Sequence, residues 1–372
     1  MSKWRILLVV VTCVFAGAAA QACASQDTES QAEQPEPRSL PTFEVDDGWM
    51  KVPEQWKIGD ASSFAIDSGG NVWLLHRPWT LGPDDVAMAA PPIMVFDSGG
   101  DFVKALGGPG DGYEWPQREH GLHIDSEDFV WVTGNNCPTN GLPREPVADD
   151  QVLKFAPDGS VVLQIGHSGD GTASNADTEN VHRAADAWVH APTNEVFVAD
   201  GYGNSRVVVF DADTGAFKRM WGAFGDVPVD DATCEVIYFG DPAGPGLEAF
   251  NLIHAVAVSN DGTVYAADRE NRRVQVFSTD GTFVDEMIKT DTEFARGLAF
   301  SADPEQQFLY VGNGENIAII ERATFEMVGA ISVPGMIGGG HQIASDSNGN
   351  IYIAQTAAGV QKLSYTGLSQ VP

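Results

Sequence analysis

Three things are scarce in this sequence: basic side chains, cysteines and long apolar runs. The 372 residues include 21 Lys and Arg against 52 Asp and Glu, which gives a formal net charge of −31. Nucleic acids and anionic membrane faces are bound by clustered Lys and Arg, so this balance argues strongly against both as partners. Because 43% of the residues are apolar, the chain is expected to be globular rather than disordered.

The only long apolar run lies at the N-terminus and is typical of an export signal. Lys3 and Arg5 precede it, and it covers residues 6–20. A bilayer-spanning helix needs about 20 residues, so the run suits a signal peptide better than a membrane anchor. We therefore expect residues 1–22 to be removed and the protein to be exported.

The processing site leaves two interpretations open. The run ends in Ala20-Gln21-Ala22-Cys23, which resembles a bacterial lipoprotein cleavage box without its usual leucine. A lipid on Cys23 would tie the protein to a membrane, and residues 23–42 would be a polar tether. The alternative is cleavage by an ordinary signal peptidase, which gives a secreted soluble protein. In both cases the location is periplasmic, at the cell surface or outside the cell.

Cysteine is used sparingly in the rest of the chain. Cys137 and Cys234 are the only candidates for a disulfide after residue 23. Two buried free thiols are the alternative. No C-x-x-C motif occurs, so a cysteine-based metal or redox site is not expected.

Six stretches share one pattern: an alternating apolar strand, a tight turn and a second apolar strand. Turn pairs such as Gly69-Gly70 and Asn348-Gly349 are typical of hairpins. A third strand follows every pair, and a fourth follows five of them. The stretches are residues 64–77, 122–135, 188–201, 256–269, 298–313 and 343–355. A repeated four-strand unit cannot bury its faces alone, so the pattern predicts an all-β, six-bladed β-propeller.

The sequence also indicates how the ring closes. The sixth unit stops after its third strand, near Tyr365, and a strand-like segment from Gly48 to Gly59 precedes the first unit. We expect this N-terminal segment to complete the last blade, because closure removes an open sheet edge. The predicted propeller covers residues 43–372. Two stacked β-sandwiches, the alternative, explain neither the repeat nor the missing fourth strand.

Histidine occupies one register of alternate units. Five positions before the end of the first strand stand His120, His254 and His341, in units 2, 4 and 6. Alternate blades lie about a third of a turn apart, so the three imidazoles should converge on the channel axis. Three histidines with an open fourth position are typical of a catalytic zinc site. The alternative is a polar plug of the channel.

Further polar residues follow the second strands, which end at the same face. Arg77 and Arg269 occupy the same register, and Tyr202 lies between two glycines in a longer loop. Two guanidinium groups, a phenol and a metal suit an anionic, oxygen-rich substrate. By contrast, Arg206 and Arg273 belong to a repeated Asn-x-Arg pattern similar to the inter-blade packing of NHL-type propellers, so we assign them to structure.

Four strings in this chain resemble peptidyl-α-hydroxyglycine α-amidating lyase, the lyase half of the peptide-amidating enzyme. They are REHGLHID, VFVADGYGNSRVVVF, FNLIHAVAV and VYAADRENRRVQVF. The resemblance implies that His120, His254 and His341 bind Zn²⁺, that Tyr202 is the catalytic base, and that Arg77 and Arg269 line the pocket. It also implies a peptide or small-molecule substrate with a carboxylate. Separately, we expect the protein to be a monomer.

Some residues depart from the family pattern. A methionine and an acid that flank the third histidine in the family are Gly339 and Gln342 here. In the family the acid binds a structural Ca²⁺ together with two backbone carbonyls, which here correspond to those of Phe64 and Leu122. Neutral Gln342 weakens such a site. Gly203 replaces one of the family's disulfide cysteines.

Three functions remain to be weighed. The leading hypothesis is a zinc lyase that breaks the C–N bond of a carbinolamide to release an amide and glyoxylate. The rival is a non-catalytic NHL propeller that binds a protein or a glycan. A lactonase-like propeller is the third, but lactonases use carboxylate and Asn ligands, so the three histidines disfavour it.

Overall fold

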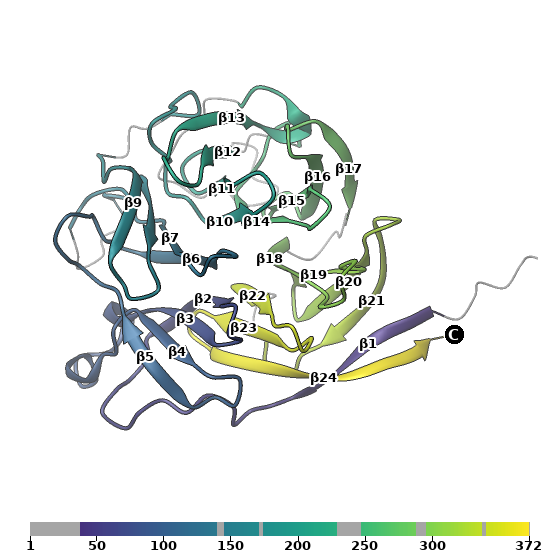
Figure 1. The fold of residues 1–372 in the computed structure, drawn as a ribbon, viewed down its shortest axis with the longest axis horizontal. Coiled ribbons are helices and arrows are strands. Elements are labelled where there is room, and N and C mark those ends of the chain that lie inside the picture. The colour runs from purple at the N-terminus through teal and green to yellow at the C-terminus, as the bar shows by residue number, and fades with distance from the viewer. Residues whose placement is uncertain are drawn as a thin grey trace, which may run out of the picture. The chain divides into compact units, whose positions relative to one another are not determined.

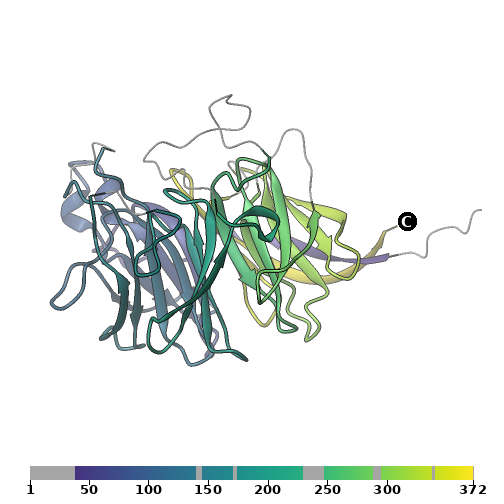
Figure 2. The same cartoon turned by 90° about the horizontal axis from the view of Figure 1, so that it is seen from above.

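The chain folds into six four-stranded sheets placed around a central axis (Figure 1). The computed structural model describes residues 38–139, 145–170, 174–228, 247–287, 295–336 and 340–371. In five sheets the four strands are consecutive in the chain, pair antiparallel, and run outwards from an innermost first strand; in the sixth sheet β22 is innermost and β1 is outermost (Figure 1). Seen from the side, the strands run between the two faces of the ring (Figure 2). The predicted six-bladed β-propeller is confirmed.

The blades follow one another along the chain. Blade 1 contains β2 (Asp60–Ile66), β3 (Val72–Arg77), β4 (Ile93–Phe96) and β5 (Phe102–Leu106), and blade 2 contains β6 (Glu119–Ile124), β7 (Val130–Gly134), β8 (Gln151–Phe155) and β9 (Val161–Gly166). Blade 3 contains β10 (Asp186–His190), β11 (Glu195–Asp200), β12 (Arg206–Asp211) and β13 (Phe217–Trp221), and blade 4 contains β14 (Ile253–Val258), β15 (Thr263–Asp268), β16 (Arg273–Ser278) and β17 (Phe283–Met287).

The last two blades complete the ring. Blade 5 contains β18 (Ala295–Phe300), β19 (Phe308–Asn313), β20 (Asn316–Glu321) and β21 (Glu326–Ser332). Blade 6 combines β22 (Gln342–Ser345), β23 (Ile351–Gln355) and β24 (Gly359–Val371) with the N-terminal β1 (Arg38–Val45). Three short 3₁₀ turns, η1 (Pro78–Thr80), η2 (Val86–Met88) and η3 (Ala223–Gly225), lie in the connections. Among the described residues, no helix has the length and apolar character to cross a bilayer.

An aspartate at the end of the innermost strand fixes the hairpin turn in three blades. One of its carboxylate oxygens accepts a hydrogen bond from the backbone N–H of the residue four positions later. The other oxygen accepts a hydrogen bond of 2.8–2.9 Å from the side chain of a Trp or Tyr six positions later. The pairs are Asp67–Trp73, Asp125–Trp131 and Asp346–Tyr352. The repeated turn signal in the sequence therefore also anchors a core aromatic ring.

The hydrophobic cores lie between neighbouring blades. One core packs Trp73 and Val95 of blade 1 against Val130 and Phe155 of blade 2, and all four side chains are buried. Burial of each large apolar side chain stabilises the fold by about 1.5–3 kcal/mol. Because every blade buries its faces only against its neighbours, the ring depends on closure between blades 1 and 6.

Closure uses an N-terminal strand, as expected, but not the predicted segment. β1 pairs with β24 and begins at Arg38, within the stretch assigned to the tether. The expectation that residues 48–59 form the closing strand is wrong. That segment instead packs Trp49 into the core between blades 1 and 6, where its ring lies 5.0 Å from the ring of Tyr352. Its apolar residues thus fill an inter-blade gap rather than pair with a sheet.

Several expectations concern residues outside the described ranges. The signal peptide, Cys23 and the tether up to residue 37 are among them, and so are Cys234 and Gly339. Cys137 is disulfide-bonded, so the alternative of a free thiol is wrong for this residue. Its pairing with Cys234 stays a prediction.

Candidate metal centre

Three imidazoles meet on the propeller axis where the innermost strands of blades 2, 4 and 6 begin. His120 and His254 are the second residues of β6 and β14, and His341 immediately precedes β22. One ligand atom from each residue lies within 4.8 Å of the other two, and the ring centroids are 4.4–4.9 Å apart. The structure thus brings together the three histidines that the register predicted.

The odd-numbered blades orient these rings. The Nδ1 atoms of His120 and His341 donate to the carbonyls of Ala185 and Ser62, each at 2.6 Å. Ala185 and Ser62 are the residues that stand in the histidine register of blades 3 and 1. Since Nδ1 is the donor, Nε2 of both rings is free of a proton and can bind a metal.

All three imidazoles are neutral. Their pKa values lie well below the ordinary 6.5, chiefly because the rings are buried. A proton on a neighbouring histidine would lower the pKa of His120 and His254 further, and the charge of Arg77 lowers that of His341. A neutral imidazole is the form that binds a transition metal.

His254 supports a metal site independently. Both of its ring nitrogens are buried and have no hydrogen-bond partner among the described residues. The backbone of Arg296, in the same register of blade 5, raises the pKa of His254, but it does not reach either nitrogen in hydrogen-bonding geometry. Buried polar atoms rarely lack a partner, so a metal bound by the three neutral imidazoles fits these residues.

Tyr202 reaches the histidine cluster from the loop after β11. Its hydroxyl lies 3.1 Å from Nε2 of His120 and accepts a hydrogen bond of 3.1 Å from Nη1 of Arg269. The phenol oxygen therefore lies between a potential metal ligand and a guanidinium group. A base in this position can take a proton from a group bound at the cluster.

Arg183, which sequence reasoning missed, clamps the Tyr202 loop. The Tyr202 N–H donates to the Arg183 carbonyl at 3.3 Å, and Nη1 of Arg183 donates to the Tyr202 carbonyl at 2.9 Å. The Arg183 guanidinium also lies 5.7 Å from the centroid of the Tyr202 ring. Arg183 has φ = 61°, a left-handed conformation that costs a non-glycine residue about 1–3 kcal/mol. The sequence around Arg183 contains no recognisable motif, because the role of Arg183 depends on contacts with residues that are distant in the chain.

Gly203 completes the clamp on the other side of Tyr202. A Cβ at this position would lie 2.1 Å from the ring of His182, so only glycine fits. His182 is in turn fixed by Asp150, with 2.7 Å between Nδ1 and the carboxylate. The family's cysteine is thus replaced by a close backbone approach to a buried His–Asp pair.

The two predicted arginines lie beside the cluster in different surroundings. The Arg77 Nε donates to the Glu119 carbonyl at 2.8 Å, and burial, followed by the charge of Arg118, lowers the Arg77 pKa to about 10. Arg269 pairs with Glu270 at 2.7 Å. Burial acts to lower the pKa of Arg269, but the charges of Tyr202 and Glu270 outweigh it and raise the pKa. Because Arg269 is already paired with Glu270, Arg77 is better placed than Arg269 to bind an anionic ligand.

The residues assigned to calcium lie further along the channel. Phe64, Leu122 and Gln342 all line a cavity beyond the histidines. The Gln342 side-chain N–H donates to the His254 carbonyl at 3.0 Å, so this residue supplies no charge there. The calcium site stays a prediction.

The fold and the histidine cluster define a six-bladed propeller with a candidate metal centre, and the NHL repeat family matches residues 250–277. This chain is similar to peptidyl-glycine alpha-amidating monooxygenase of Mus musculus, with 28% identity over 301 residues that cover 75% of this chain and 26% of that protein. It is 28% identical to a probable peptidyl-alpha-hydroxyglycine alpha-amidating lyase of Caenorhabditis elegans over 281 residues, 70% of this chain and 69% of that one. The suspected relationship to the amidating lyases is confirmed, at modest identity.

Other similarities concern the repeat and the fold. NHL repeat-containing protein 3 of Homo sapiens is 27% identical over 245 residues, 64% of this chain and 57% of that protein. A streptogramin B lyase structure superposes with a TM-score of 0.52 at 12% identity, over 87% of this chain and 98% of that one. At this identity the structural likeness supports the fold alone.

Proposed function

We propose that this protein is a zinc-dependent lyase that cleaves a peptidyl-α-hydroxyglycine or a similar carbinolamide into an amide and glyoxylate. The observation that carries the proposal is the Tyr202 hydroxyl, 3.1 Å from both His120 Nε2 and Arg269 Nη1. Relatives named as amidating lyases support the same reaction class.

The chemistry needs an acceptor for the hydroxyl proton of the substrate. His120, His254 and His341 would hold a Zn²⁺ ion, which would supply Lewis-acid activation of that hydroxyl. The Tyr202 phenol relays one proton: its oxygen accepts the proton of the substrate hydroxyl, and its own O–H proton goes to the amide nitrogen. As this happens, the C–O bond becomes the C=O of glyoxylate and the C–N bond breaks. The hydrogen bond from Arg269 holds the Tyr202 oxygen in position beside the histidines.

Binding of the substrate carboxylate is assigned to Arg77 and Arg269. Arg77 is buried, and no described carboxylate forms an ion pair with it. A guanidinium fork that reaches a carboxylate in a buried pocket gives both affinity and orientation. We therefore expect Arg77→Lys, which keeps the charge and loses the fork, mainly to raise KM.

The experiment is glyoxylate release from a peptide extended with α-hydroxyglycine, using protein loaded with zinc. We expect stoichiometric glyoxylate and peptide amide above the spontaneous rate. Absence of release across peptides with different penultimate residues would favour the alternative, a non-catalytic NHL propeller that binds a protein or glycan. The similarity to NHL repeat-containing protein 3 is the observation behind that alternative.

Export is part of the proposal. Lys3, Arg5 and the following apolar run support a signal peptide. The mass of the mature N-terminus distinguishes a lipid on Cys23 from a free secreted chain. Such a protein would act as a monomer on its substrate, without nucleic acid as a partner.

A further inference from the structure

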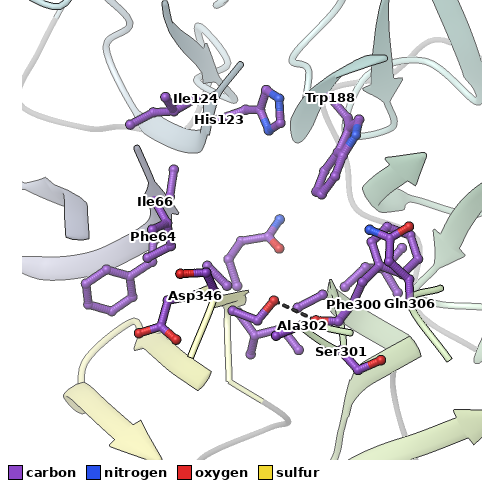
Figure 3. A pocket seen from close by; sticks show the side chains of 18 of the residues that line it. Phe64, Ile66, His123, Ile124, Trp188, Phe300, Ser301, Ala302, Gln306 and Asp346 are labelled. Carbon is purple, nitrogen blue, oxygen red and sulfur yellow. Dashed lines mark hydrogen bonds between the residues drawn. The ribbon is translucent and has the colours of Figure 1, made fainter. Parts of the chain in front are cut away.

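The channel cavity beyond the histidines, which Phe64, Leu122 and Gln342 help to line, is large enough to be considered as a site of its own. It has a volume of about 370 Å³. Its lining comes from β2, β6, β10, β18 and β22, from residues that lie after the histidine position in each strand, and from the turns after β18 and β22. Figure 3 shows His123 and Trp188 pointing into its open centre, with Phe300 on the same side as Trp188. A cavity of this volume can hold a small molecule. None of the residues assigned to zinc, proton transfer or carboxylate binding lines it.

One wall of this cavity breaks the repeat. Three residues beyond the histidine register, blades 1, 4, 5 and 6 have alanine, whereas blades 2 and 3 have His123 and Trp188. The rings of these two residues lie 4.8 Å apart, and Trp188 meets Phe300 at 88° with 5.8 Å between ring centroids. Burial lowers the pKa of His123 to about 3, so its ring is neutral. The result is an aromatic corner that faces small side chains.

A carboxyl group lies at the inner end of the same wall. Asp186 is one residue beyond the histidine register and lines the cavity, two residues before Trp188 on β10. Its carboxylate accepts the Val256 N–H at 3.4 Å, and within the described parts of the chain it forms no ion pair. No Lys or Arg is among the described lining residues. Burial raises the pKa of Asp186 to about 8, as expected for a carboxyl group that lacks a cation.

We propose that this cavity binds a small organic ammonium ion with an apolar body. The ammonium group would pair with the Asp186 carboxylate, and the body would lie against Trp188 and Phe300. An aromatic corner beside a carboxylate is suited to such a cation, through cation–π attraction and a charge-assisted hydrogen bond. The net charge of −31 favours the approach of a cation from solution. This site is independent of the proposed lyase reaction.

The test is isothermal titration of the full protein with benzylammonium, and with benzyl alcohol as a probe of the same shape without charge. We expect one benzylammonium per chain, and binding of benzyl alcohol at least tenfold weaker. Asp186→Asn should weaken benzylammonium binding at least tenfold, and Trp188→Ala should weaken it as well. Asp303→Asn is the matched control, because Asp303 also lines the cavity but is engaged in its own turn with Ser301 and Gln307.

Three outcomes would overturn the proposal: no saturable binding of benzylammonium, equal binding of benzyl alcohol, or displacement of benzylammonium by Ca²⁺ in a manner that depends on Asp186. The last would show that the carboxylate serves an inorganic cation. A His254→Ala variant separates this proposal from the lyase, because it should keep its affinity for benzylammonium whether or not the protein releases glyoxylate.

Discussion

The two ends of the central channel have opposite electrostatic character. Around the histidines, the guanidinium groups of Arg77, Arg269 and Arg296 each lower the pKa of His341. At the other end, the described lining includes the carboxyl groups of Asp186, Asp303 and Asp346 and no Lys or Arg. The chain has 21 basic and 52 acidic residues, so a channel end surrounded by arginines would not be expected from the composition alone.

This difference shows where the repeat has been modified. Six identical blades would place the same residue at each equivalent position along the channel. A position at which one or two blades carry a different residue is therefore a candidate for a specific role. At one end histidine alternates with other residues, and at the other the large side chains gather on blades 2 and 3. We therefore expect substitutions at one end to leave ligand binding at the other end unchanged.

The largest effect is expected for the phenol at the histidine end. Tyr202→Phe removes the hydroxyl that lies between His120 and Arg269, so turnover of a peptidyl-α-hydroxyglycine should fall by about 10²–10⁴-fold. Zinc content and benzylammonium binding should not change. Steady-state kinetics with both binding measurements test this, and wild-type turnover in the variant would remove Tyr202 from the mechanism.

A smaller effect is expected for the clamp behind Tyr202. Arg183→Met removes the hydrogen bond to the Tyr202 carbonyl and the cation over the ring, so the phenol loses its fixed position. Misplacement of a catalytic group can cost about 10²-fold, and we expect kcat to fall by about 10- to 100-fold with little change in KM. Arg183→Lys, which keeps the charge, should recover part of the loss. A fall in melting temperature with unchanged kcat of the folded protein would indicate that Arg183 only stabilises the fold.

The smallest effect concerns stability at the acidic end. The pKa of Asp186 rises from 3.8 to about 8 on folding, so between these values the folded state binds the additional proton and loses stability as the pH rises. Asp186→Asn removes this loss. The free energy of unfolding of the variant, relative to that of the wild type, should therefore be higher at pH 9 than at pH 4. Urea titrations at the two pH values measure it, and an equal difference at both would refute the shift.

The sequence was sufficient for the number of blades, the closure by an N-terminal strand and the meeting of the histidines, because all three depend on the repeat register. It misplaced the closing strand, since the apolar residues around Trp49 fill a gap between blades rather than pair in a sheet. It also missed Arg183 and Asp186. Their environments are made by segments that are distant in sequence, such as Asn135 beside Arg183 and Val256 beside Asp186.

The metal content of the purified protein tests the central claim most directly. We expect about one zinc per chain in the wild type after loading and dialysis, and a large loss in His254→Ala, because three imidazoles with an open position are the minimum set for such a site. His123→Ala, at the other end of the channel, should keep its zinc. A wild type without stoichiometric zinc, or a His254→Ala variant with the same zinc content as the wild type, would contradict the account.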